Sequence, residues 1–287
     1  MKKGFSIYQI NEIVNNYFNK VLKTKSSSLI KALTIGNKND LEEELQKDIS
    51  NVGISHLFVI SGLHINIIAM CIRFMLKKFH LKEHVINIFT IIILFIYFFI
   101  TGLLISVLRV IISYILKLIN KIFNYQLSGV DIICINIILV LLVNPFYIYQ
   151  YSFILSYIIS FSIIISNNLL TTFSKYQFFI TSLKTSILSL FVTLPIISNI
   201  NPDINFLSIF YNILYIPFVT YILLPMAFLT AIFPLLEFIF NYVYLFFETL
   251  TNFFANIKIF TFTFPSVNII IIFIYYVLMY LILKIWN

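Results

Sequence analysis

Residues 85–102 read VINIFTIIILFIYFFITG, a run of 18 residues without one charged side chain. A helix needs about 20 apolar residues to cross the roughly 30 Å hydrocarbon core of a bilayer. Similar runs recur near 55–76, 103–120, 130–146, 151–170, 177–199, 205–236, 237–257 and 266–285. The pattern predicts an all-α, polytopic membrane helical bundle of about eight to ten spans.

The composition agrees with lipid as the solvent of this chain. Hydrophobic residues make up 61% and charged residues 10% of the 287 residues, against roughly half and a quarter in soluble domains. Cys71 and Cys134 lie inside apolar runs, where we expect them to fill the core. Two cysteines exclude a disulfide scaffold and a cysteine-rich metal centre. The sequence also contains no phosphate-loop, GxGxxG or HExxH motif, and we expect no metal and no cofactor.

Charge is concentrated at the N-terminus. Residues 1–54 hold eight lysines and six acids, and apolar residues between Phe5 and Leu22 recur at helical spacing. This predicts an amphipathic helix at the membrane interface, followed by a turn at 36–40 and an acidic helix over 41–49. The sequence therefore predicts a charged segment, 1–54, preceding a transmembrane domain, 55–287.

Basic residues predict the orientation of the spans. By the positive-inside rule the cytoplasmic ends carry Arg73, Lys77, Lys78, Lys82, Lys117, Lys121, Lys175 and Lys284. The segments at 144–145, 199–205 and 263–266 then lie on the opposite side, as does the N-terminal segment, although a lysine-rich tail is disfavoured there. The 32 residues of 205–236 contain Pro217, Pro225 and Pro234, which predicts a broken or re-entrant helix that crosses once.

Polar residues gather in the first span, where residues 56–64 read HLFVISGLH. Polar groups in lipid must pair with each other, with backbone or with water, and four interpretations of this cluster stay open. His56 and His64 could bind a metal, although no third ligand is near. Ser61 and His64 could form a nucleophile–base pair. Alternatively, the cluster packs a broken helix into the bundle, with Gly62 allowing close approach, or lines a polar path.

Further polar groups interrupt later spans. Arg109 lies inside the third span, where an arginine must snorkel, face water or pair, with Asp131 or Glu248 as candidate partners. The other candidates for a pore or a packing role are Asn144, Pro145, Ser156, Asn212 and Pro217.

The order of these features resembles the channel region of the ComEC family of competence proteins. The matching stretches are LTIGNKN at 33–39, GISHLFVISGLH at 53–64, SVLR at 106–109, LLVNP at 141–145, SFILS at 152–156, LP at 194–195 and FLS at 206–208 continuing through Asn212 to Pro217. Family members often have a glutamine where this chain has Ile154. Many also carry OB-like and metallo-β-lactamase-like domains, which these residues do not include.

The resemblance implies a multi-pass channel component of the cytoplasmic membrane that imports single-stranded DNA in natural transformation, and not an enzyme. Its expected pore residues are His56, Ser61, Gly62, His64, Arg109, Asn144, Pro145, Ser156, Asn212 and Pro217. Its expected partners are single-stranded DNA, lipid, and a motor, nuclease or DNA receptor on other chains, with a homodimer left open. The alternatives are a small-solute transporter, an intramembrane hydrolase using Ser61 and His64, and an inactive remnant of a competence channel.

Overall fold

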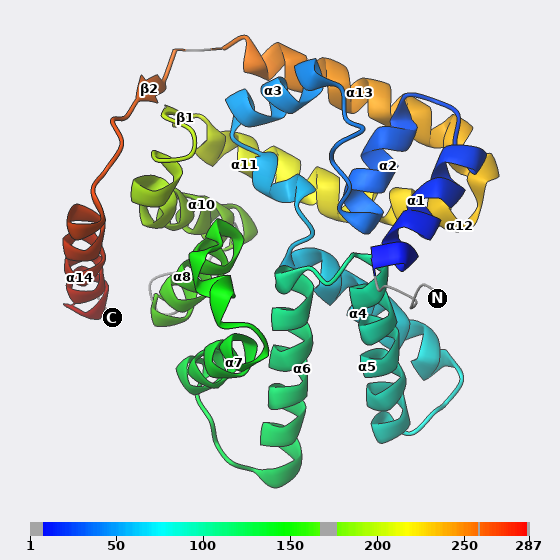
Figure 1. Cartoon of the computed structure of the whole chain (residues 1–287), viewed down its shortest axis with the longest axis horizontal. Helices are drawn as coiled ribbons and strands as arrows, with labels where there is room; N and C mark the ends of the chain where they lie inside the picture. The colour runs from blue at the N-terminus through cyan, green and yellow to red at the C-terminus, as the bar shows by residue number, and fades with distance from the viewer. Residues whose placement is uncertain (1–7, 167–176, 258, 286–287) are drawn as a thin grey trace, which may run out of the picture. The chain divides into compact units, whose positions relative to one another are not determined.

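The computed structural model describes residues 8–166, 177–257 and 259–285 (Figure 1). The contacts group the chain into two compact units. Unit 1 comprises Met1–Asp48, Ser55–Ile115 and Pro217–Phe253, and unit 2 comprises Ile49–Ile54, Leu116–Ile216 and Phe254–Asn287. The division of the sequence into 1–54 and 55–287 stays a prediction; in space, the first 48 residues are grouped with later segments.

The N-terminal segment of unit 1 forms helices α1 (Tyr8–Val21), α2 (Ser26–Ile35) and most of α3 (Glu43–Val52). The expected amphipathic helix is present as α1, although Phe5 lies outside the described residues. Helix α1 packs on α2 and α5 (Glu83–Ile100), and α2 packs on α12 (Leu224–Ile232). Nine of the ten α2 residues are buried, so part of this charged segment belongs to the core.

Lys31 shows how a lysine is accommodated within that core. It is 5% exposed, and its ammonium group donates to Asn19 Oδ1 and forms a 2.6 Å ion pair with Asp40. A buried ammonium is tolerated only with such partners. Lys31 thereby joins α1, α2 and the turn after α2.

The other helices of unit 1 follow the predicted spans. They are α4 (Gly62–Lys78), α5, the first part of α6 (Ile105–Phe123), α12 and most of α13 (Glu237–Ala255). Helix α4 packs on α5, and the two lie side by side in Figure 1. The predicted first span begins instead with a short 3₁₀ helix, η1 (Ser55–Phe58), and is broken before α4.

The stretch 205–236 differs from the predicted broken helix. Helix α11 (Ser208–Phe218) continues through a π-helical turn, η3 (Val219–Leu223), into α12 without a gap, and the chain leaves the helix only before η4 (Pro234–Leu236). Pro217 removes one backbone donor, and the following wider π turn keeps the helix continuous. The prediction of a break was therefore wrong at Pro217 and Pro225. The helix ends only at Phe233, directly before Pro234.

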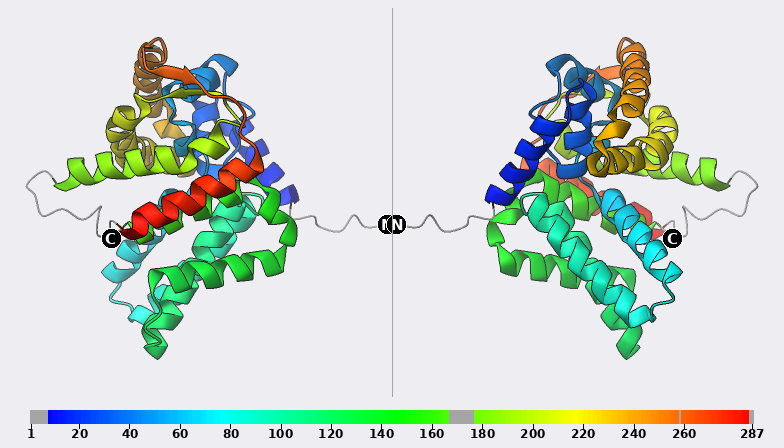
Figure 2. Two further views of the ribbon diagram at one scale, coloured as in Figure 1. Left: turned by 90° about the vertical axis from the view of Figure 1, so that its left-hand side faces the viewer. Right: turned by 90° about the vertical axis from the view of Figure 1, so that its right-hand side faces the viewer.

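Unit 2 contains α7 (Gly129–Val143), the 3₁₀ helix η2 (Pro145–Tyr149), α8 (Tyr151–Ile165), α10 (Gln177–Ile197) and α14 (Ile269–Ile285). Helix α8 packs on α7, α10 and α14, and α10 also packs on α14. Figure 2 shows α14 running beside α10. The aromatic residues around η2 are exposed, Tyr149 at 80% and Tyr151 at 53%, as expected for an interfacial belt.

A small antiparallel sheet joins two distant loops of unit 2. Strand β1 (Asp203–Asn205) pairs with β2 (Thr261–Thr263), with Ile204 opposite Phe262. The Asn199 side chain also donates to the Val267 carbonyl at 3.1 Å and accepts from the Val267 N–H at 2.7 Å. The two loops that the charge pattern placed on one side of the membrane are thus in contact.

The end of α3 belongs to the same side of unit 2. Asn205 donates to the Asn51 carbonyl at 3.0 Å, and Asn201 donates to the Ser50 hydroxyl at 3.3 Å. These contacts agree with the predicted location of residues 49–54, opposite the lysine-rich ends of the spans.

Among the described residues, three helical stretches are long and apolar enough to cross a membrane. They are Glu83–Ile100, Phe179–Ile197 and Ser208–Ile232, with shorter apolar helices at Gly129–Val143, Tyr151–Ile165 and Ile269–Lys284. The expected multi-pass helical membrane protein is confirmed, and the exact number of spans stays a prediction. Cys71 and Cys134 are exposed on their helices, so the prediction that they fill the core was wrong.

Candidate functional site

The segment 56–64 bends sharply inside unit 1. Leu57, Phe58 and Ile60 are almost completely buried, and the Phe58 ring packs against Phe247 of α13 at 5.3 Å between centroids. Ser61 is extended, with φ −110° and ψ 171°, and α4 begins at the next residue. The apolar side chains hold η1 in the core, while the polar residues mark the start of a new helix.

Ser61 and His64 contact each other, as the nucleophile-pair interpretation required. Ser61 Oγ lies 2.9 Å from His64 Nδ1, and the Ser61 backbone N–H donates to the same nitrogen at 3.4 Å. Because an N–H can only donate, Nδ1 is the unprotonated nitrogen and Nε2 carries the proton. The Ser61 side chain also faces the His64 backbone N–H, and the His64 side chain accepts from the Ser61 backbone N–H. These two reciprocal contacts form a capping box at the start of α4. The pair therefore already has a structural role in starting the helix.

The opposite nitrogen of the same ring is buried. Within the described part of the chain, His64 Nε2 has no hydrogen-bond partner. A buried imidazole N–H without an acceptor is energetically unfavourable. The position is therefore suited to a water molecule or a group of a passing ligand that accepts a hydrogen bond from this N–H.

Arg109 of α6 lies close to Gly62, the first residue of α4. A Cβ atom at Gly62 would lie 3.5 Å from Arg109 Nη2 and 3.4 Å from Val110 Cγ2. The guanidinium group thus lies close to the first turn of a 17-residue helix, whose N-terminus carries a partial positive charge. The charge of arginine and the helix terminus together favour an anion at this point.

His56 does not join this cluster as a metal ligand. His56 is exposed, whereas His64 is buried, and the described residues hold no group of three metal-ligating side chains that could bind an ion.

The carbonyl of neighbouring Ser55 accepts from Lys38 Nζ at 3.4 Å. Burial lowers the pKa of Lys38 because it disfavours the charged form.

The proposed partners of Arg109 have contacts of their own. Asp131 accepts from the Ser128 backbone N–H at 2.8 Å and from the Ser128 hydroxyl at 2.7 Å, which caps α7. Glu248 accepts from the Tyr244 hydroxyl at 3.0 Å. Pairing of Arg109 with either carboxylate stays a prediction.

Pro217 lies inside α11, and the other predicted polar residues belong to unit 2. Asn144 Oδ1 accepts from the Phe146 N–H at 3.0 Å and caps η2, with Pro145 as its first residue. Ser156 is half-buried in α8, and Asn212 is half-buried in α11. Asn212 Oδ1 is buried and has no partner among the described residues. The structure thus brings Ser61, Gly62, His64 and Arg109 together, and gives Asn144 and Pro145 a capping role.

Two polar contacts were not anticipated from the sequence. Asn136 of α7 is fully buried and accepts from the Tyr157 hydroxyl of α8. As the only amide in α7, Asn136 could have been singled out in the same way as Asn212.

Arg73 forms the second contact. Its guanidinium donates to Asn87 and Glu83 of α5 and, at 2.8 Å, to the Tyr114 hydroxyl of α6. Besides contributing to the positive charge at this end of the span, it therefore ties three helices together.

Comparison with known proteins identifies the family of this chain. The model of the family described as "Competence protein" matches residues 33–287, which is most of the chain. The chain belongs to the Competence protein family. The match includes the broken segment 56–64, Arg109 and each of the other polar residues discussed above.

Three curated relatives extend the comparison. ComE operon protein 3 of Bacillus subtilis (strain 168) is 27% identical over 227 residues, which cover 78% of this chain and 28% of the relative. Uncharacterized protein MG316 of Mycoplasma genitalium is 28% identical over 293 residues, covering 97% of this chain and 74% of the relative. The MG316 homolog of Mycoplasma pneumoniae is 30% identical over 167 residues, covering 58% of this chain and 42% of the relative.

This competence-family chain thus spans less than a third of the Bacillus relative. No solved structure matches it significantly.

Proposed function

We propose that this chain forms part of a path for single-stranded DNA across the cytoplasmic membrane. The observation that carries the proposal is the position of the Arg109 guanidinium beside the first turn of α4. Membership of the Competence protein family supports DNA as the transported molecule.

A DNA backbone presents one phosphate per nucleotide, and cationic groups contact these phosphates without reading sequence. An arginine at the centre of a span costs about 2.5–3.5 kcal/mol on insertion scales. Arg109 is the fifth residue of α6, so its cost is smaller than this value but still calls for a compensating role. A helix N-terminus adds roughly 0.3–1 kcal/mol toward an anion. One cation with one helix terminus makes a weak site, and weak sites favour conduction because they release what they bind.

Replacement of Arg109 tests the proposal in a naturally competent host. The host's own copy of the gene for this protein is deleted, and the wild type or a variant is expressed in its place. Arg109→Gln keeps hydrogen-bonding capacity but removes the charge, and we expect uptake of labelled DNA to fall at least tenfold. The matched control is Lys121→Gln, which removes an exposed charge from the last turn of the same helix and should retain uptake. Membrane abundance of each variant is measured by immunoblot. Wild-type uptake by an equally abundant Arg109→Gln protein would refute the proposal.

A hydrolytic role for Ser61 and His64 is a second hypothesis, favoured by their 2.9 Å contact. Asparagine caps helices about as well as serine but supplies no hydroxyl nucleophile. If the contact serves only as a cap, Ser61→Asn retains uptake and stability, while Ser61→Ala loses about 1 kcal/mol of stability. Loss of uptake by a stable Ser61→Asn protein would instead favour the hydrolase.

The small-solute alternative rested on a broken helix at 205–236. That stretch is continuous through Ile232, so the feature that motivated this alternative is absent. The driving force for import is proposed to come from a motor or nuclease on another chain.

A further inference from the structure

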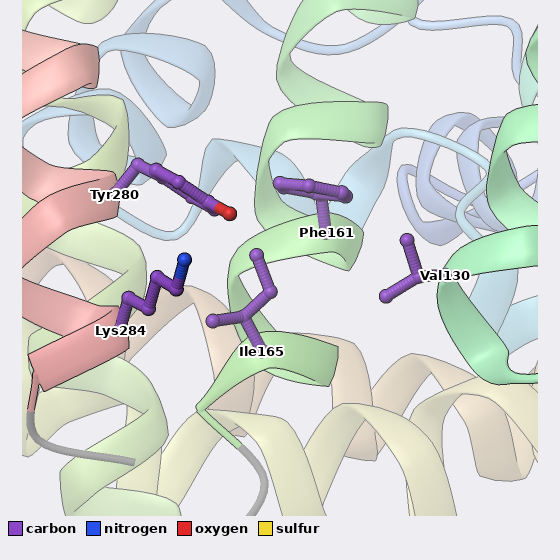
Figure 3. A pocket seen from close by; sticks show the side chains of 5 residues that line it. All are labelled: Val130, Phe161, Ile165, Tyr280 and Lys284. Carbon is purple, nitrogen blue, oxygen red and sulfur yellow. The ribbon is translucent and has the colours of Figure 1, made fainter.

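A groove in unit 2 lies among α7, α8, α10 and α14. One part is a cavity of about 370 Å³ lined by Val130, Phe161, Ile165, Tyr280 and Lys284 (Figure 3). A second part, of about 340 Å³, shares Phe161, Ile165 and Tyr280 with the first and continues past Ile158 and Met279. Each part falls in the range of about 300–1,000 Å³ typical of small-molecule sites.

The polar groups of the groove are gathered at one end. Figure 3 shows the Tyr280 hydroxyl and the Lys284 ammonium projecting from α14 toward the space in front of Phe161 and Ile165. Within the described residues, neither group is hydrogen-bonded or ion-paired. The other two tyrosines of the groove have partners, since Tyr157 bonds Asn136 and Tyr276 donates to the Val192 carbonyl at 2.7 Å. Ser162, the remaining hydroxyl residue of the second part, is buried, whereas Tyr280 and Lys284 are exposed. The accessible polar groups among the described lining residues therefore lie at this end of the groove.

The charge pattern assigns the same end of the groove to one surface of the membrane. Val130 lies in the first turn of α7, Ile165 is the last residue of α8, and Lys284 lies in the last turn of α14. The lysine pattern of the sequence, which includes Lys284 itself, predicts that all three of these helix ends lie on the cytoplasmic side. The groove thus has a cationic mouth at the headgroup level and an apolar floor that extends toward the hydrocarbon core.

We infer that this groove binds one anionic phospholipid of the cytoplasmic leaflet. Its phosphate lies between Lys284 and the Tyr280 hydroxyl, and an acyl chain follows Phe161, Ile158 and Met279 along the groove. Basic pockets between transmembrane helices on this side of a membrane are suited to anionic headgroups. The predominantly apolar lining disfavours a nucleic acid strand or a soluble anion, which would leave most of the groove unoccupied.

Native mass spectrometry of the purified full chain in detergent tests the inference by titration with phosphatidylglycerol or phosphatidylcholine of identical acyl chains. The wild-type protein should retain one phosphatidylglycerol per chain in preference to phosphatidylcholine. Lys284→Gln should weaken phosphatidylglycerol binding about fivefold, which corresponds to about 1 kcal/mol for one basic residue at an anionic surface. Binding of phosphatidylcholine should change little.

A second variant tests the apolar part of the groove. Ile158→Trp fills the space in which the acyl chain lies and should weaken both lipids to a similar extent. Two controls match these changes: Lys121→Gln removes an exposed lysine from the end of α6, and Leu142→Trp enlarges a side chain of α7 that is 76% exposed. Both controls should bind lipid like the wild type. Each variant is compared by melting temperature, so that loss of folding is distinguished from loss of binding.

Three results would overturn the inference. One is unchanged phosphatidylglycerol binding by a folded Lys284→Gln protein. Another is unchanged binding of both lipids by folded Ile158→Trp. The third is a dimer mass that is lost in both variants while lipid binding persists, because the groove would then be occupied by a second copy of the chain.

Discussion

Gly53, between α3 and η1, provides a quantitative test of the close contact with α11. It has a φ of +80°, and a Cβ atom there would lie 2.7 Å from Ser208 Cβ. A left-handed conformation costs a residue with a Cβ about 1–2 kcal/mol. Overlap in a packed site costs about 1–3 kcal/mol more. Gly53→Ala should therefore lower the free energy of unfolding by about 2–5 kcal/mol.

Two further variants separate these contributions. Gly102 has a φ of +72°, but the nearest atom to its added Cβ is 3.6 Å away, so Gly102→Ala should cost only about 1–2 kcal/mol. Adding Ser208→Gly to Gly53→Ala removes the overlapping atom and leaves Ser208 Cα at 4.0 Å. The double variant should recover the overlap energy but not the conformational cost.

The assay is unfolding by sodium dodecyl sulfate in mixed micelles, monitored by circular dichroism, for the wild type, the three single variants and the double variant. The reasoning fails if Gly53→Ala and Gly102→Ala are equally destabilised. It also fails if Ser208→Gly does not rescue Gly53→Ala, because the 2.7 Å contact would then not be the source of the strain.

Three other variants test the buried polar contacts by melting temperature in detergent. Glu237 accepts from the Lys23 N–H, the Thr24 N–H and the Thr24 hydroxyl, so Glu237→Gln should cost about 1.5–3 kcal/mol, and Glu248→Gln, with one hydroxyl donor, should cost less. Arg73→Lys cannot reproduce the planar fork that joins three helices and should cost about 1–2 kcal/mol; a wild-type melting temperature would contradict the network. Tyr157→Phe leaves the buried Asn136 oxygen without its donor and should cost about 1–3 kcal/mol, whereas Tyr149→Phe, at an 80% exposed site, should change stability by less than about 0.5 kcal/mol.

The sequence predicted the helices well because apolar length alone determines them in lipid. Expected spans near 85–102 and 237–257 correspond to α5 and α13. Ser61 and Gly62 also marked a real break, since a cap residue and a glycine interrupt a helix by local chemistry. Proline was a poorer guide, because the π turn after Pro217 accommodates the missing backbone donor without ending the helix.

Side-chain partners were harder to predict than helices. The contact of Ser61 with His64 is local, so a spacing of three residues was sufficient to anticipate it. The contacts of Arg73 with Tyr114 and of Glu237 with Thr24 join residues 41 and 213 positions apart. A single sequence gives no distance between such positions, so these residues could be interpreted only as orientation signals or not at all.

The contact between Glu237 and the α1–α2 loop has a consequence for biosynthesis. Lys23 and Thr24 are translated 213 residues or more before their carboxylate acceptor. Until α12 has been inserted, α2 lacks this helical partner, and until α13 has been inserted, the loop donors lack their acceptor. We therefore expect a nascent chain interrupted before residue 224 to expose an apolar helix and to remain a substrate for membrane quality-control proteases, however well its first spans have inserted.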